Sequence, residues 1–162
     1  MGVRRRTLGQ RGSKNPVTWR PDLTELSDLR RRQETRNVDW VLRRAQWLPV
    51  VDRELIEAVY RDGRRPAELA RLAGVPVSTV RSRVKRVLTR ACSDKLAFVV
   101  LRKDSWSPTR RRVAERLVIC GDSIREAARH LGLSHYTVRR HRAAIDELYH
   151  ESRETATNAQ AG

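Results

Sequence analysis

The sequence predicts an all-α protein in which two three-helix units follow one another, preceded by a basic N-terminal arm. Three observations support this fold class. Apolar residues recur at helical spacing over most of the chain beyond residue 21. Proline and glycine stand where helices would begin and end. A stretch of the first half of the chain also returns, in altered form, in the second half.

The internal repeat becomes visible when the chain is shifted by 58 residues. Between 66–81 and 124–139, seven of the sixteen aligned positions are identical. The identical pairs are Glu68/Glu126, Ala70/Ala128, Arg71/Arg129, Gly74/Gly132, Thr79/Thr137, Val80/Val138 and Arg81/Arg139. The repeat therefore predicts two copies of one helical unit.

The N-terminal part divides into two segments. Residues 1–21 are rich in Arg, Gly, Asn, Pro and Ser and hold few apolar residues, so we expect a disordered basic arm. Residues 22–47 contain leucines at a three-residue spacing and predict one or two helices that pack on the segment that follows. Trp40 and Trp47 in this segment, and Trp106 further on, are expected to be core anchors.

Residues 48–92 form the first predicted unit. Its three helices are expected to run from Pro49 to Gly63, from Pro66 to Gly74, and from about Val77 to Ala91. Gly74 is expected to take the left-handed conformation that a tight turn requires. The apolar residues of the third helix that should face the core are Val80, Val84, Val87 and Leu88.

Residues 107–151 repeat this pattern and form the second unit. Pro108 opens its first helix, and Ser123 with Glu126 forms a capping box for its second helix. The last helix is expected to reach about Glu151.

Two further segments complete the chain. Residues 93–106 are predicted to form a short connecting helix after a cap at Ser93, and residues 152–162 a disordered tail. One position departs from the repeat, because Arg142 stands where the first unit has Val84, an expected core residue.

Charge and motifs restrict the function. The chain has 35 Lys and Arg against 19 Asp and Glu, a formal net charge of +16, which favours a nucleic-acid partner. Cys92 and Cys120 have no companion ligands nearby in sequence, so no metal site is predicted. We also find no catalytic motif, cofactor-binding loop, membrane span or secretory signal, and expect a non-enzymatic, cofactor-free protein of the cytoplasm that associates with the nucleoid.

A helix, a tight glycine turn and a second helix rich in Ser, Thr and Arg form the helix-turn-helix pattern, whose second helix can enter the major groove of DNA. Both units show this pattern. Arg can pair with guanine, and Ser and Thr can bond phosphates or base edges. The DNA-facing residues predicted in the first unit are Ser78, Thr79, Arg81, Ser82, Lys85 and Arg86. Those predicted in the second unit are Tyr136, Thr137, Arg139, Arg140 and His141.

Residues 48–91 resemble region 4 of bacterial sigma factors of the sigma-70 family. The resemblance rests on the opening Leu-Pro, on the step Glu68-Leu69-Ala70, and on the run from Leu72 to Arg81, which follows the family's LGVS..TVR pattern. Pro76 stands where that family usually has a capping Ser. The second unit, through REAARHLGLSHYTVRRH, resembles the same broad superfamily, including the LuxR-type helix-turn-helix.

The resemblance implies a domain that binds the −35 element of promoters and contacts the flap of RNA polymerase. A complete sigma factor also needs a core-binding and strand-melting domain, for which the 47 residues before Leu48 are too few. We therefore expect a sigma-like regulator of transcription that binds double-stranded DNA, with RNA polymerase as a second partner.

Three other functions stay open at this point. Tandem helix-turn-helix units also serve the DNA-recognition parts of recombinases, transposases and small terminases. An adaptor could dock on RNA polymerase and hardly touch DNA. RNA binding is disfavoured, because aromatic residues make up only 5% of the chain and no stacking sheet is predicted.

Overall fold

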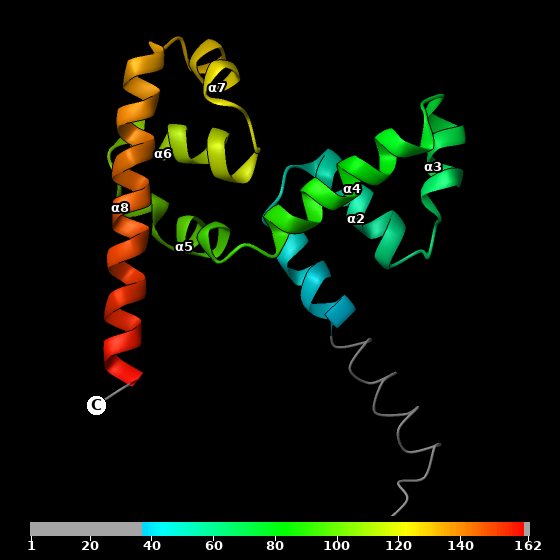
Figure 1. The fold of residues 1–162 in the computed structure, drawn as a ribbon, viewed down its shortest axis with the longest axis horizontal. Helices are drawn as coiled ribbons and strands as arrows, with labels where there is room; N and C mark the ends of the chain where they lie inside the picture. The colour runs from blue at the N-terminus through cyan, green and yellow to red at the C-terminus, as the bar shows by residue number, and fades with distance from the viewer. Residues whose placement is uncertain (1–36, 161–162) are drawn as a thin grey trace, which may run out of the picture.

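The computed structural model describes residues 37–160, and this part of the chain is helical without any strand (Figure 1). The prediction of an all-α fold is confirmed. Residues 37–45 are helical, and they are followed by α2 (Val50–Tyr60), α3 (Pro66–Ala73), α4 (Val77–Ala91), α5 (Asp94–Arg102), α6 (Pro108–Ala114), α7 (Ile124–Leu131) and α8 (His135–Gln160). A 3-10 turn, η1 (Lys103–Ser105), follows α5, and a π-helical turn, η2 (Glu115–Ile119), continues α6. The predicted arm at 1–21 lies outside the described residues.

The turn between α3 and α4 has the geometry that its sequence predicts. Pro66 occupies the first position of α3, where the missing N–H removes no helical hydrogen bond. Gly74 ends the helix with a φ of 63°, in the left-handed region. The backbone N–H of Val75 then donates to the carbonyl of Ala70 at 3.1 Å, which closes the turn. Pro76 precedes α4 and supplies no side-chain cap.

The turn between α7 and α8 is a near copy of the first. Ser123 Oγ accepts a hydrogen bond from the backbone N–H of Glu126 at 3.2 Å, and the Glu126 carboxylate accepts one from the backbone N–H of Ser123 at 2.8 Å. These bonds form the predicted capping box, and they lower the pKa of Glu126. Gly132 has a φ of 64°, and the N–H of Leu133 donates to the carbonyl of Ala128 at 3.0 Å.

Each unit has its own hydrophobic core. The first core consists of Val41, Ala45, Leu48, Ile56, Val87, Ala91 and Leu96. The second core consists of Val99, Val113, Ala114, Ala127, Ala128, Val138 and Ile145. Burial of these side chains holds the helices of each unit together. Each of the larger aliphatic residues contributes about 1.5–3 kcal/mol by being buried.

Helix α5 is common to both units. Leu96 belongs to the first core and Val99 to the second, and neither is accessible to solvent. Val118 and Ile119 of η2 also pack against both cores. The predicted connecting segment is therefore a helix that is packed on both sides, although the Ser93 side chain makes no capping hydrogen bond.

The structure corrects two expectations. Helix α8 continues to Gln160, so that most of the tail predicted as disordered from residue 152 is helical. Trp40, expected to be a core anchor, keeps 41% of its surface exposed. Trp47 and Trp106 are half-buried and pack against the first and second core respectively, as expected of anchors.

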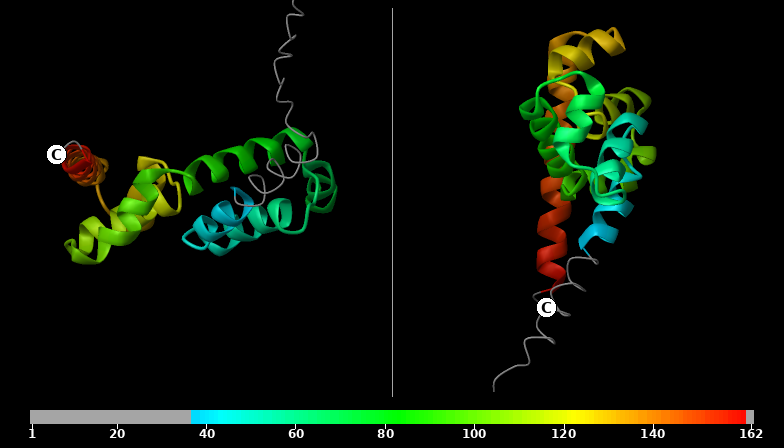
Figure 2. Two further views of the ribbon diagram at one scale, coloured as in Figure 1. Left: turned by 90° about the horizontal axis from the view of Figure 1, so that it is seen from below. Right: turned by 90° about the vertical axis from the view of Figure 1, so that its right-hand side faces the viewer.

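The two units present their longest helices in different directions. Helix α8 stands upright in Figure 1 while α4 runs across the view, and Figure 2 (left) shows α8 almost end-on. The N-termini of both helices lie beside the short helices α3 and α7 that precede them (Figure 1). None of the helices in the described part of the chain is long and apolar enough to cross a membrane.

Candidate nucleic-acid interface

The first two turns of α4 form a polar surface on the first unit. Val80 of α4 and Ala70 of α3 are buried where these two helices pack together, and this packing fixes the rotation of α4 about its axis. As a result, four of the six residues predicted to face DNA in this unit lie together on the solvent side: Ser78, Thr79, Arg81 and Ser82. Within residues 37–160, no acidic side chain forms an ion pair with Arg81.

The remaining two predicted residues of this unit, Lys85 and Arg86, lie further along α4. Both line a groove of about 540 Å³ between the two units. Arg142 of α8 also lines this groove, and Leu117 and Ile145 contribute apolar surface. The sequence placed all six residues on one recognition face, whereas the structure divides them between the exposed end of α4 and the groove.

In the second unit, three of the five residues predicted to face DNA are exposed on α8: Tyr136, Arg139 and Arg140. Tyr136 is 75% exposed, which is unusual for so large a side chain without a bound partner. Thr137 is half-buried because it takes part in the cap of α8: its backbone N–H donates to Ser134 Oγ at 3.0 Å, and the two hydroxyls lie 2.9 Å apart.

His141 does not lie with the other predicted residues of α8. It is half-buried where α8 packs against α6. Burial lowers the pKa of His141, and the positive charges of Arg140 and of Arg110 in α6 lower it further. The neutral imidazole therefore belongs to the packing of the second unit, and its contribution to an exposed binding face is small.

The equivalent position of the first unit shows why His141 differs. The shift of 58 residues relates His141 to Arg83 and Arg110 to Asp52. In the first unit, Arg83 forms an ion pair with Asp52 at 3.2 Å. In the second unit the acid is replaced by Arg110, so a charged residue at 141 would meet a like charge. Sequence comparison of the two copies could have detected this exchange.

Arg142 does not disturb the second core. It is 55% exposed and forms an ion pair with Asp146 at 3.7 Å, one helical turn later. Val84, the equivalent residue of the first unit, is itself only half-buried. The expectation that this position belongs to the core is wrong for the second unit, because the position lies at the edge of the packed face.

The geometry of the first unit agrees with a comparison to known families. Residues 39–90 match the family described as Sigma-70, region 4. The match covers most of the helical residues 37–45 and all of α2 and α3, and it ends at the last turn of α4. No curated protein and no solved structure matches the chain significantly.

The match begins upstream of residue 48, where the sequence placed the start of the first unit. The structure agrees with the earlier start, because Val41 and Ala45 are buried in the first core. The first helix-turn-helix unit is therefore sigma-70 region 4-like and includes the helix before α2. The second unit lies outside the match.

Proposed function

We propose that this protein binds double-stranded DNA in a sequence-specific manner and regulates transcription as a sigma-like factor. Helix α4 would enter the major groove of a −35-type element, and α8 would contact a second stretch of the duplex. The observation that supports the proposal most strongly is the exposed end of α4. It is anchored by the buried Val80 in a unit that matches sigma-70 region 4, and it presents Ser, Thr and Arg to solvent.

The division of the basic residues suggests two roles. Arg81 lies at the exposed end of α4, where a side chain can reach base edges in the major groove. Lys85 lies in the groove between the units, where it would meet the phosphate backbone. Base contacts determine sequence preference, whereas phosphate contacts contribute affinity that falls as salt rises.

The experiment is a footprinting and gel-shift series on genomic fragments, repeated over a range of salt concentrations. Arg81→Ala should weaken binding to the preferred site by about 1–3 kcal/mol and relax the sequence preference. Lys85→Ala should weaken binding to all duplexes similarly and reduce the salt slope by about one. Arg102→Ala is the matched control, because it removes one exposed arginine of α5 that lies beside the C-terminal half of α8 and not beside the predicted DNA-facing residues.

Binding that is independent of salt and unchanged by Arg81→Ala would contradict the proposal. Footprints over terminal repeats or packaging sites, and not over promoters, would favour the recombinase, transposase or terminase alternative.

A second activity, docking on RNA polymerase, is supported by a separate observation. Val50 and Val51 at the start of α2 are 55% and 61% exposed, although they are adjacent apolar residues. We propose that this surface contacts polymerase. Val51→Asp should abolish capture of purified RNA polymerase and leave DNA affinity unchanged. Equal capture by the wild-type protein and the variant would refute the docking surface.

A further inference from the structure

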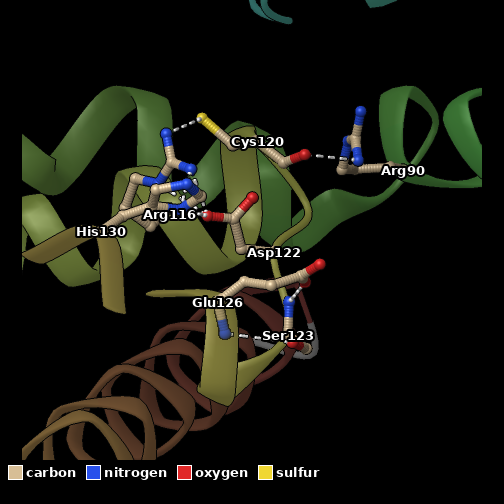
Figure 3. Close-up of polar contacts among 7 residues, drawn as sticks. All are labelled: Arg90, Arg116, Cys120, Asp122, Ser123, Glu126 and His130. Carbon is tan, nitrogen blue, oxygen red and sulfur yellow. Dashed lines mark hydrogen bonds and ion pairs between the residues drawn. The ribbon is translucent and has the colours of Figure 1, made fainter. Parts of the chain in front are cut away.

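Arg90, in the last turn of α4, connects the two units through polar contacts, and Figure 3 shows the contact with Cys120. Its guanidinium forms an ion pair with Asp52 of α2 in the first unit. The same guanidinium donates a hydrogen bond through Nη1 to the carbonyl oxygen of Cys120, which follows η2 in the second unit, at 2.9 Å. The side chain is only 18% exposed. We refer to this pair of contacts as the Arg90 bridge.

The bridge requires a glycine in the second unit. Gly121 has a φ of 77°, and a Cβ built on it would overlap with the guanidinium of Arg90. Gly63, its equivalent in the first unit, has a similar φ of 66°, but a Cβ there would meet no atom within 4 Å. The two glycines share the backbone conformation, and only Gly121 also makes room for an arginine of the other unit.

Apolar packing supports the same junction. Leu96 and Val99 place α5 in both cores, and the half-buried Val118 and Ile119 contact both cores as well. A second arginine, Arg44, donates to the carbonyl of Ser93 at 3.4 Å at the start of α5. The chain between α4 and α5 is therefore held by contacts on several sides.

From these contacts we infer that Arg90 fixes the relative orientation of the two units, so that the protein recognises a bipartite DNA site with one defined spacing. The inference rests on the proposed function. Two recognition helices in a fixed orientation can meet two half-sites only at one separation, because inserting about 5 bp turns the second half-site to the opposite face of the duplex. Two loosely tethered units would tolerate many spacings. Arg90 is thus a positioning residue, which acts through the orientation of α4 and α8.

The experiment compares the full-length wild-type protein with Arg90→Met and Arg83→Met. Both variants lose one positive charge of α4 and one ion pair with Asp52, but of the two arginines only Arg90 forms a hydrogen bond with the second unit. Arg90→Lys is a second test variant, because a single ammonium group cannot satisfy the Asp52 carboxylate and the Cys120 carbonyl with the planar geometry of a guanidinium.

The first readout does not involve DNA. Spin labels are attached to Cys introduced at the exposed residues Arg71 of α3 and Arg125 of α7, in a background with Cys92 and Cys120 replaced by Ser. We expect a narrow distance distribution for the wild-type protein and for Arg83→Met, and a broad one for Arg90→Met and Arg90→Lys. Equally narrow distributions in all four proteins would overturn the role of Arg90.

The second readout is selection from a random duplex library. The wild-type protein should enrich two motifs at one spacing, and inserting 5 bp between them should weaken binding by about tenfold or more. For Arg90→Met the same insertion should weaken binding by less than about threefold. A single enriched motif, or the same spacing dependence in the variant, would overturn the inference. Enrichment of no sequence by any protein would instead refute the proposed function, and the distance measurement would still decide whether Arg90 orients the units.

Discussion

The pair Gly63 and Gly121 allows the energy of the Arg90 bridge to be measured. Both residues have positive φ values, at 66° and 77°, and occupy equivalent places in the two units. Replacing either by Ala imposes a left-handed conformation on a residue with a Cβ, which costs about 1–2 kcal/mol. Part of this cost is offset by the lower conformational entropy of the unfolded chain, by about 0.4–1 kcal/mol. We therefore expect Gly63→Ala to lower the free energy of unfolding by about 1 kcal/mol.

Gly121→Ala should destabilise the protein more, because its Cβ would displace the Arg90 guanidinium from the Cys120 carbonyl. A hydrogen bond from a charged donor contributes about 1.5–3 kcal/mol. With the backbone cost included, we expect a loss of about 3 kcal/mol for Gly121→Ala. The assay is equilibrium unfolding in urea, followed by far-UV circular dichroism at neutral pH, on the full-length protein.

A double variant separates the two causes. In the Arg90→Met background no guanidinium remains to be displaced, so Gly121→Ala should cost only about 1 kcal/mol, as Gly63→Ala does. If Gly121→Ala and Gly63→Ala destabilise the wild-type protein equally, or if the cost of Gly121→Ala is unchanged in the Arg90→Met background, the argument for the bridge fails.

Three further predictions concern other parts of the structure. Burial lowers the pKa of His141 below its ordinary value of 6.5, so the unfolded chain binds the proton more readily than the folded protein. The free energy of unfolding should therefore fall as the pH is lowered through 6.5. Urea unfolding of His141→Gln should show a smaller loss of stability over that pH range, and an equal loss would contradict the burial of a neutral imidazole. Arg44→Met removes the ion pair with Asp94 and the contacts of the guanidinium with Trp40 and Trp47, whose ring centroids lie 5.0 and 5.1 Å from it. The variant should therefore lower the free energy of unfolding by about 2 kcal/mol and change the tryptophan fluorescence. An unchanged emission spectrum would show that these contacts do not form. Ending the chain after Ser152 removes a helical segment whose side chains are exposed over 153–158. The free energy of unfolding should therefore change by less than about 0.5 kcal/mol, while the helical circular dichroism signal decreases. A larger loss of stability would show that this segment packs on the rest of the protein.

Local chemistry explains why the turns could be predicted from the sequence. The limits of α3 and α4 agree with those expected, because proline at a helix start and glycine at a helix end act through their own backbone geometry. The capping box of Ser123 and Glu126 is likewise confined to one turn of helix. The buried positions of Val80 and Val87 followed from helical periodicity.

Features that depend on distant parts of the chain were missed. The Arg90 bridge joins residues 30 or more positions apart, and no local pattern indicates it. The repeat predicts His141 on the binding face together with the other polar residues at the start of α8, whereas the packing of α6 on α8 decides which side of the helix is exposed. The extension of α8 beyond residue 151 was missed for another reason. That segment has no apolar periodicity, and extending an existing helix costs far less than nucleating one.

The repeat also shows what its second copy has lost. The shift of 58 residues that relates the two units places Leu148 of α8 at the position of Arg90. The second copy therefore has an apolar side chain where the first copy has its connecting arginine. Leu148 lines a small hollow with Phe98 of α5 and with Trp106, which both pack against the second core. A longer array is therefore best designed from the first copy, which carries the arginine and, at Gly63, the equivalent of Gly121, because the second copy has Leu148 in place of the arginine.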